Sequence, residues 1–236
     1  MTFYEMIGQY YDELFPPSLA QKNFLGRLIK VPSRVLDLGC ATGGYASYLA
    51  QIGHQVEALD LDPGMIGQLK KKYAELSTLT AEVGDIKALS QRQGDYDLIY
   101  CIGNTLVHLA HKGEVSDFVK AAYDQLKPGG RLVIQSVNYD RVLKYQLQSL
   151  PTIERPGAGL VFERAYKHVS SGIQFMGRLH VGDQRYEAET HLLPILKDDL
   201  KKAFICAGFS EMGFYGDFEE SPFTAESPAL VTLTVK

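Results

Sequence analysis

The sequence predicts an α/β fold: a doubly wound, mainly parallel sheet with an antiparallel β segment inserted near its C-terminal end. Two patterns carry this prediction. From Arg34 to Gln135, short apolar runs alternate with helical segments, as in the βαβ units of a parallel sheet. From Leu160 to Leu193, apolar runs follow one another without helices, and Gly182-Asp183 between two of them is typical of a hairpin turn.

The individual elements follow from periodicity and from the residues that interrupt it. Strands are expected at Arg34–Leu38, Gln55–Asp60, Thr78–Val83, Tyr96–Ile102 and Arg131–Gln135. Helices are expected between them at Tyr45–Gln51, Pro63–Tyr73 and Glu114–Leu126, and the breaker Lys127–Gly130 ends the last one. Antiparallel strands are expected at Leu160–Tyr166, Ile173–Val181 and Arg185–Leu193, before a helix at Lys197–Ala207 and a closing pair at Phe214-Tyr215 and Leu230–Val235.

These elements suggest three parts. Residues 1–33 read as an N-terminal helical segment. Residues 34–139 and 194–236 form the main sheet domain, and residues 140–193 form the inserted antiparallel segment over a ligand site.

Composition narrows the class of protein. The net charge is −4 with no basic stripe, which disfavours nucleic acid as a partner, because nucleic-acid affinity comes mostly from basic residues. No stretch approaches the roughly 18 apolar residues of a membrane span, and the start of the chain does not resemble a signal peptide. The three cysteines form no CxxC pair, so we expect reduced thiols, a cytoplasmic location and no metal site.

Glycines and acidic residues fall at the ends of three successive predicted strands. Asp37 and the glycine-rich turn after it follow the first strand, Asp60 ends the second, and Asp85 with Ile86 follows the third. A carboxylate at Asp60 is placed to accept hydrogen bonds from a ribose diol, and Asp85 to accept one from an adenine amino group. Taken singly, the three carboxylates could also be a turn residue, a helix cap and a loop residue. Their order at strand ends that converge favours a nucleoside-containing ligand.

The sequence here resembles the class I S-adenosylmethionine-dependent methyltransferases. The similar stretches are VLDLGCATG (35–43), VEALDLDPGMI (56–66), GDI (84–86) and LKPGGRLVI (126–134). The resemblance covers almost the whole chain and implies a Rossmann-like fold with S-adenosyl-L-methionine as cofactor. It implies cofactor contacts from Asp37, Gly39, Ala41, Gly43, Asp60, Leu61, Asp85 and Ile86. Ala41 stands where the family usually has glycine, and we expect the turn to survive with a slightly altered backbone.

A dinucleotide-dependent dehydrogenase is the nearest competing class of enzyme. Its fingerprint is G-x-G-x-x-G, which places a pyrophosphate at a helix N-terminus. This chain has Ala41 in place of the middle glycine. S-adenosylmethionine contains no pyrophosphate, so the methyltransferase interpretation is favoured.

The second half of the sheet region is similar to the glycine N-methyltransferase group. The stretches are CIGNTLVHL (101–109), VNYDRVL (137–143) and YGDFEESPF (215–223). The resemblance implies that Cys101, Ile102 and His108 contact the cofactor and that Asn104 faces the acceptor. It also implies that the N-terminal segment, residues 1–33 with Tyr11, covers the cofactor as a lid. Asn104 and His108 are therefore the candidate catalytic residues. The alternatives are a core histidine, a turn asparagine and a tyrosine that only packs in its helix.

One departure bears on the methyl acceptor. The glycine enzyme has an arginine for the substrate carboxylate where this chain has Val137, and burying a carboxylate without a cation is costly. We therefore expect a small neutral or cationic acceptor in place of glycine, methylated on nitrogen or oxygen by direct in-line displacement. His108 would be the base for a hydroxyl acceptor. A methyltransferase acting on a protein or RNA, and a non-catalytic cofactor-binding regulator, remain alternatives.

Overall fold

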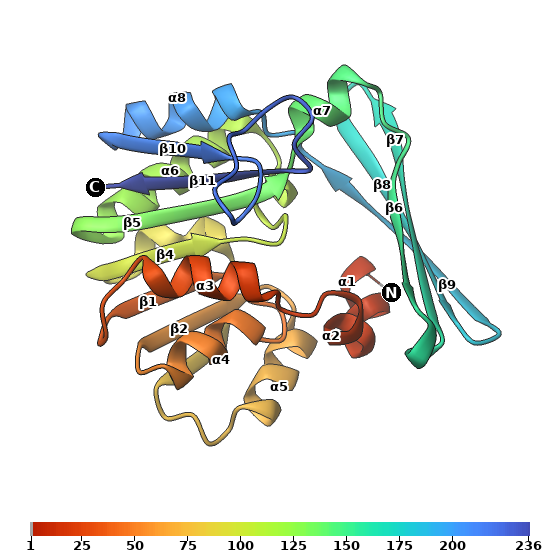
Figure 1. Cartoon of the computed structure of the whole chain (residues 1–236), viewed down its shortest axis with the longest axis horizontal. Helices are drawn as coiled ribbons and strands as arrows, with labels where there is room; N and C mark the ends of the chain where they lie inside the picture. The colour runs from red at the N-terminus through yellow and green to blue at the C-terminus, as the bar shows by residue number, and fades with distance from the viewer. Residues whose placement is uncertain (1) are drawn as a thin grey trace.

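The structure is a computed structural model that describes residues 2–236. Two β-sheets organise the molecule. A seven-stranded sheet is built from the first and last parts of the chain, and a four-stranded sheet stands beside the ends of its strands (Figure 1). The large sheet is mainly parallel, and the small sheet is antiparallel. The predicted α/β fold with an inserted antiparallel segment is therefore confirmed.

The large sheet has the strand order β10-β11-β5-β4-β1-β2-β3. Its parallel strands are β1 (Arg34–Leu38), β2 (Gln55–Asp60), β3 (Leu79–Val83), β4 (Tyr96–Cys101) and β5 (Leu126–Val137). The pair β10 (Glu211–Tyr215) and β11 (Ala229–Val235) is antiparallel, and β11 runs against β5. Because β1 lies between β4 and β2, the strand order reverses there, and ligands of such sheets bind outside the carboxyl ends at that point.

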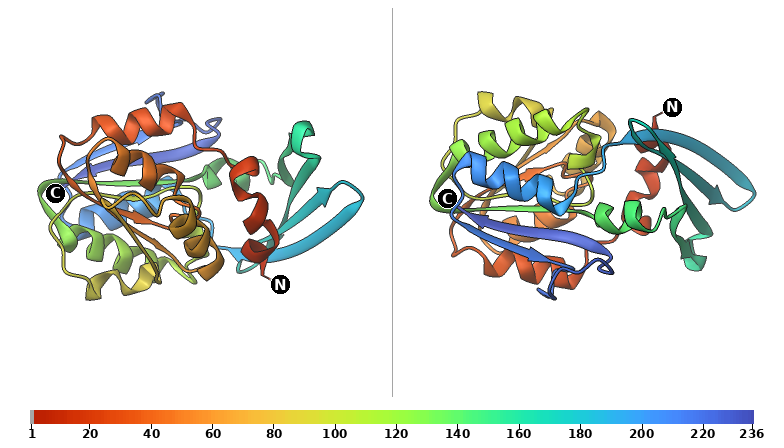
Figure 2. Two further views of the ribbon diagram at one scale, coloured as in Figure 1. Left: turned by 90° about the horizontal axis from the view of Figure 1, so that it is seen from below. Right: turned by 90° about the horizontal axis from the view of Figure 1, so that it is seen from above.

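Helices cover both faces of the large sheet (Figure 2). One face carries α3 (Leu19–Arg27), α4 (Gly44–Gln51) and α5 (Pro63–Lys72), whose apolar side chains share one core cluster. The other face carries α6 (Lys112–Gln125), α8 (Lys197–Ala207) and the 3-10 helix η2 (Ile86–Gln91). This two-sided cover explains why the central strands β1 and β4 are almost fully buried.

The small sheet has the order β6-β7-β8-β9 and is reached through α7 (Tyr139–Lys144). Its strands are β6 (Ser149–Arg155), β7 (Leu160–Val169), β8 (Gly172–Val181) and β9 (Gln184–Leu192), with a short 3-10 turn, η4 (Pro156–Ala158), after β6. The sequence pattern predicts β7, β8 and β9 but not β6. Strand β6 contains Pro151, which an edge strand tolerates because one side of it needs no ladder hydrogen bonds.

The N-terminal segment lies between the two sheets (Figures 1 and 2). It consists of α1 (Phe3–Ile7), the 3-10 turn η1 (Gly8–Tyr10) and α2 (Tyr11–Leu14), in place of one continuous helix. Helix α1 packs on β8 and β9, and α2 packs on β6. The turn allows the segment to bend across the carboxyl ends of the parallel strands.

The three-part division at residues 33, 139 and 193 remains a prediction, although the small sheet falls entirely within 140–193. No helix within residues 2–236 is long and apolar enough to cross a membrane. Within the same residues, no three His, Cys, Asp or Glu side chains are grouped so that they could hold a metal ion.

Candidate active site

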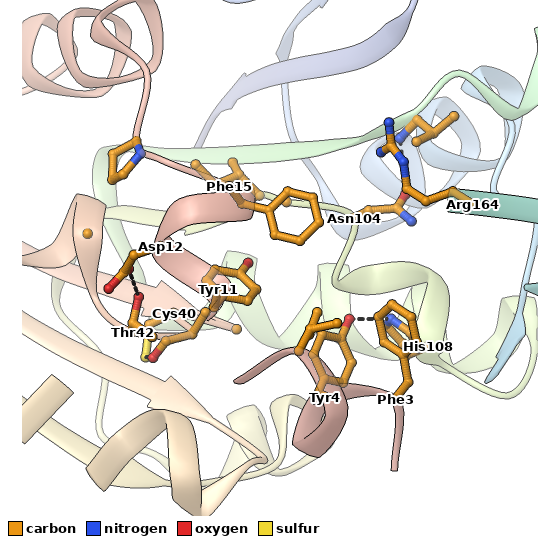
Figure 3. Close-up of a pocket in the computed structure, with 18 of the residues that line it drawn as sticks. Phe3, Tyr4, Tyr11, Asp12, Phe15, Cys40, Thr42, Asn104, His108 and Arg164 are labelled. Carbon is orange, nitrogen blue, oxygen red and sulfur yellow. Dashed lines mark hydrogen bonds between the residues drawn. The ribbon is translucent and has the colours of Figure 1, made fainter. Parts of the chain in front are cut away.

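A cavity of about 310 Å³ opens at the carboxyl ends of the parallel strands. Its size falls in the range of small-molecule sites. Four regions line it: the glycine turn after β1, the segment after β4 with the end of β5, the N-terminal segment, and the inner face of the small sheet. Figure 3 shows Tyr4, Tyr11, Asp12 and Phe15 reaching into the cavity from the N-terminal segment.

The turn after β1 forms the floor of the cavity. Gly39 has a φ of +78° and Gly43 a φ of +80°, a left-handed conformation that favours glycine. Ala41 also adopts a positive φ, of +48°, so the turn keeps its course without the usual glycine. Gly39 and Ala41 line the cavity, whereas Gly43 faces Leu69 of α5 and does not.

Asp37 lies near the end of β1 and lines the cavity. It is 3% exposed, and its Oδ2 accepts a hydrogen bond from the Tyr100 hydroxyl at 2.7 Å. Burial raises the pKa of Asp37 to about 8, with repulsion from Asp60 adding to the rise and the Tyr100 bond opposing it. Asp37 is thus a buried acid that can take up or release a proton near neutral pH.

This raised pKa predicts a pH-dependent contribution to stability. Between its ordinary value of 3.8 and about 8, the folded protein holds a proton at Asp37 that the unfolded chain has lost. The stabilisation by this group is therefore complete below pH 3.8 and disappears as the pH rises through about 8. We expect Asp37→Asn to remove this part of the dependence of the free energy of unfolding on pH. Urea unfolding of both proteins without ligand, at several pH values between 5 and 9, measures the free energy of unfolding of each. If the two free energies change with pH in parallel, the assignment is contradicted.

Asp60 braces the glycine turn from the end of β2. Its Oδ2 accepts a hydrogen bond from the Ala41 amide at 2.8 Å, and its Oδ1 accepts one from the Asp62 amide at 2.9 Å. Burial raises the pKa of Asp60, and the hydrogen bonds oppose that rise. Asp60 does not line the cavity itself. It supports the turn from the side on which β2 lies.

The residues predicted to hold the adenosine lie outside the cavity, along the ends of β2 and β3. Asp85 accepts a hydrogen bond from the Lys87 amide at 2.9 Å and begins η2, and Ile86 packs at the edge of a core cluster. Leu61 is 68% exposed at the end of β2. Val83, at the end of the neighbouring strand β3, is 53% exposed. Two exposed apolar side chains, Leu61 and Val83, therefore lie at the neighbouring ends of β2 and β3.

His108 faces the N-terminal segment. Its Nε2 is hydrogen-bonded to the Tyr4 hydroxyl at 2.8 Å, and the two rings meet edge to face (Figure 3). Burial lowers the pKa of His108, which favours the neutral imidazole. Ile102 lines the same part of the cavity, whereas Cys101 is fully buried beneath it and does not reach the surface of the cavity.

Asn104 is held in place by two hydrogen bonds. Its Oδ1 accepts one from the Val137 amide at 3.0 Å, and its Nδ2 donates one to the Tyr139 hydroxyl at 3.2 Å. The backbone φ of +70° is uncommon for a residue with a side chain, and such conformations concentrate at functional sites. Asn104 therefore presents a fixed amide at the end of β4, next to Val137 in the cavity wall.

Several lining residues were absent from the sequence prediction. Asp12 accepts a hydrogen bond from the Thr42 hydroxyl at 2.5 Å and forms an ion pair with Lys72 of α5, so it attaches the N-terminal segment to the glycine turn (Figure 3). Arg164 and Tyr166 enter the cavity from β7. Strand alternation was the available signal for the last two, because residues 162, 164 and 166 share one face.

Comparison with known proteins agrees with this geometry. Residues 35–130 match the family model described as a methyltransferase domain. The chain is 26% identical over 193 residues to a glycine/sarcosine N-methyltransferase of Halorhodospira halochloris, covering 79% of this chain and 69% of that protein. It is 26% identical over 190 residues to a glycine/sarcosine/dimethylglycine N-methyltransferase of Actinopolyspora halophila, covering 79% of this chain but only 33% of that longer protein.

Two solved structures share the whole fold. The CcbJ methyltransferase of Streptomyces caelestis superposes with a TM-score of 0.80 at 24% identity, covering 97% of this chain and 95% of that one. An amino pentose methyltransferase of Micromonospora echinaspora, solved with S-adenosylmethionine bound, superposes with a TM-score of 0.75 at 18% identity, covering 100% of this chain and 98% of that one. The domain match and the two relatives, together with the motifs at the three strand ends, support a class I S-adenosylmethionine-dependent methyltransferase close to the glycine/sarcosine N-methyltransferase group.

Proposed function

We propose that the chain transfers the methyl group of S-adenosylmethionine to a small molecule held in the cavity between the glycine turn and the small sheet. The observation that carries this proposal is the cover over the cavity. The N-terminal segment and the small sheet close it from two sides, leaving about 310 Å³. A protein or RNA acceptor would need an open surface at this point.

The residues present suit S-adenosylmethionine. A Cβ at Gly39 would lie 2.4 Å from the Thr105 side chain, so only glycine lets the turn pack this closely against the segment after β4 while its backbone lines the cavity. In this proposal the turn and Asp37 hold the methionine part and Asp60 holds the ribose, while Leu61, Asp85 and Ile86 hold the adenine.

The sulfonium supplies an electrophilic methyl group, so the protein's task is mainly alignment, worth about 7–11 kcal/mol. The aromatic faces of Tyr4 and Tyr11 suit a positively charged sulfonium. The fixed Asn104 amide is a polar group for orienting the acceptor. His108 is a neutral imidazole that can accept a proton from a hydroxyl acceptor, and an amine acceptor that is already neutral needs no base.

The proposal also includes a cytoplasmic location and an acceptor that is not a nucleic acid. Cys40 and Cys101 are buried as free thiols and Cys206 is free on the surface, which is compatible with a reducing cytoplasm. The net charge of −4 supports a small-molecule acceptor over a nucleic acid.

The first test is binding followed by turnover. We expect S-adenosylmethionine and its demethylated product S-adenosylhomocysteine to bind with dissociation constants of about micromolar size, measured by calorimetry. A panel of small amines, acids and phenols, assayed for formation of S-adenosylhomocysteine, then separates an enzyme from a non-catalytic binder. No heat with either ligand would refute the cofactor assignment, and transfer only to folded protein or RNA would refute the enclosed small-molecule site.

A further inference from the structure

At the end of the cavity formed by the small sheet, an arginine lies among apolar and aromatic side chains. Phe162, Arg164 and Tyr166 alternate along β7, so their side chains share the face that looks into the cavity. Leu150 of β6 is the register partner of Arg164, and Phe175 of β8 is that of Tyr166. An arginine thus stands among apolar and aromatic neighbours, where a charge loses much of its hydration.

Arg164 has few partners for its five donor groups. One terminal nitrogen, Nη2, donates to the backbone carbonyl of Pro151 at 2.5 Å, while the buried Nε has no hydrogen-bond partner. Burial lowers the pKa of Arg164, and no carboxylate is among the groups that act on it. A guanidinium stays charged in proteins, so its unmatched charge is an unfavourable feature until an anion arrives.

Tyr166, two residues further along β7, also has a buried polar atom without a hydrogen-bond partner. Its hydroxyl is buried beside Tyr139 and Arg164 but makes no hydrogen bond of good geometry. Among the buried side-chain polar atoms without a partner in residues 2–236, those that belong to cavity-lining residues are the Arg164 Nε and the Tyr166 hydroxyl. Both are donors, and they lie on one face of one strand.

We propose that Arg164 and Tyr166 bind a carboxylate of the methyl acceptor, so that the substrate is a small anionic molecule. The inference rests on the proposed function and adds the class of acceptor to it. The planar fork of a guanidinium matches the two oxygens of a carboxylate, and the tyrosine hydroxyl adds a third donor. It also revises the expectation drawn from Val137, because the cation missing at that position is supplied from the inserted sheet.

Asn104 then lies between the two ends of the substrate. It lines the same cavity as Arg164 (Figure 3). Its Nδ2 donates a hydrogen bond to Tyr139, whose hydroxyl neighbours that of Tyr166. An acceptor anchored by its carboxylate at β7 would extend its nucleophilic atom toward Asn104 and the glycine turn. A cationic acceptor would meet the Arg164 charge and be repelled.

The experiment compares acceptor pairs that differ only in the anion. Suitable probes are glycine with glycinamide, 4-aminobenzoate with 4-aminobenzamide, and 4-hydroxybenzoate with 4-hydroxybenzamide. We expect the carboxylate members to be preferred in kcat/KM, and Arg164→Met to lower that value about 10- to 100-fold for carboxylates only. Arg164→Lys should retain part of the preference, and Tyr166→Phe should cost about 3- to 10-fold. Arg178→Met is the matched control, because Arg178 of β8 pairs with Glu187 and lies outside the cavity.

Binding of S-adenosylhomocysteine, measured for every variant, separates the two proposals. Unchanged binding with a selective loss of carboxylate turnover supports the anion site. Equal losses for acids and amides, or a preference for the amides in the unaltered protein, would overturn it while leaving the methyltransferase intact. If no probe is turned over, thermal shifts of the S-adenosylhomocysteine complex decide: stabilisation by the acids that Arg164→Met abolishes supports the site, and equal or absent shifts refute it.

Discussion

Replacing Gly39 by alanine is expected to lower the free energy of unfolding by about 2–5 kcal/mol and to weaken S-adenosylhomocysteine binding at least about 30-fold. Two costs add. The φ of +78° is unfavourable for alanine, and the new Cβ would lie 2.4 Å from the Thr105 side chain. The turn must move to relieve the contact, and Gly39 lines the space proposed for the cofactor, so we expect the movement to disturb binding there.

Gly129 provides the control for the backbone cost alone. It has the same φ of +78°, but no atom lies within 4 Å of the position of an added Cβ. We expect Gly129→Ala to cost about 1 kcal/mol in stability and nothing in ligand affinity. Adding Thr105→Gly to Gly39→Ala should restore part of the binding. Urea unfolding and calorimetry report both quantities, and equal effects of the two alanine variants on affinity would show that the contact with Thr105 is irrelevant.

Asp60→Ala is expected to weaken binding of S-adenosylmethionine by about 1–3 kcal/mol, or roughly 5- to 150-fold in Kd. The carboxylate accepts the amide hydrogens of Ala41 and Asp62, so the change removes a brace of the turn as well as the charged acceptor proposed for the ribose. Asp60→Asn keeps one acceptor oxygen and should lose less.

Asp62→Ala is the neighbouring control. Asp62 caps α5 by accepting hydrogen bonds from the Gly64 and Met65 amides, at 2.8 and 3.0 Å. Loss of this cap should cost about 1 kcal/mol of stability with little change in ligand affinity. Calorimetry of the three variants tests the assignment. Affinity unchanged in Asp60→Ala would mean that the second motif does not hold the ribose.

Much of the large sheet could be predicted because each βαβ unit is a local pattern. The alternation of apolar strands with helices and the breaker after α6 are visible in consecutive residues, and the structure forms strands and helices at those places. Strand β6 escaped prediction because its sequence is polar and contains Pro151; it exists through pairing with β7. The three short pieces of the N-terminal segment likewise depend on the two sheets between which they pack.

The site was predictable where it follows strand ends and less so where it depends on tertiary contacts. Asp37, Gly39 and Ala41 come from one local turn and meet in the cavity as a group. Strand alternation could place Arg164 on one face with Phe162 and Tyr166, but its buried Nε without a hydrogen-bond partner appears only in the packing of β6, β7 and the cavity. The cofactor and acceptor roles of these residues remain predictions until ligands are bound.

The separate origins of the two ends of the cavity have an evolutionary consequence. The turn proposed to hold the cofactor is built between residues 37 and 60, whereas the side chains at the proposed acceptor end come from the continuous segment of strands β6 to β9. Mutations, or exchange of that whole segment between relatives, can therefore change the acceptor while the cofactor turn stays under its own selection. A fold divided in this way lets a lineage diversify its substrates without first losing its methyl donor.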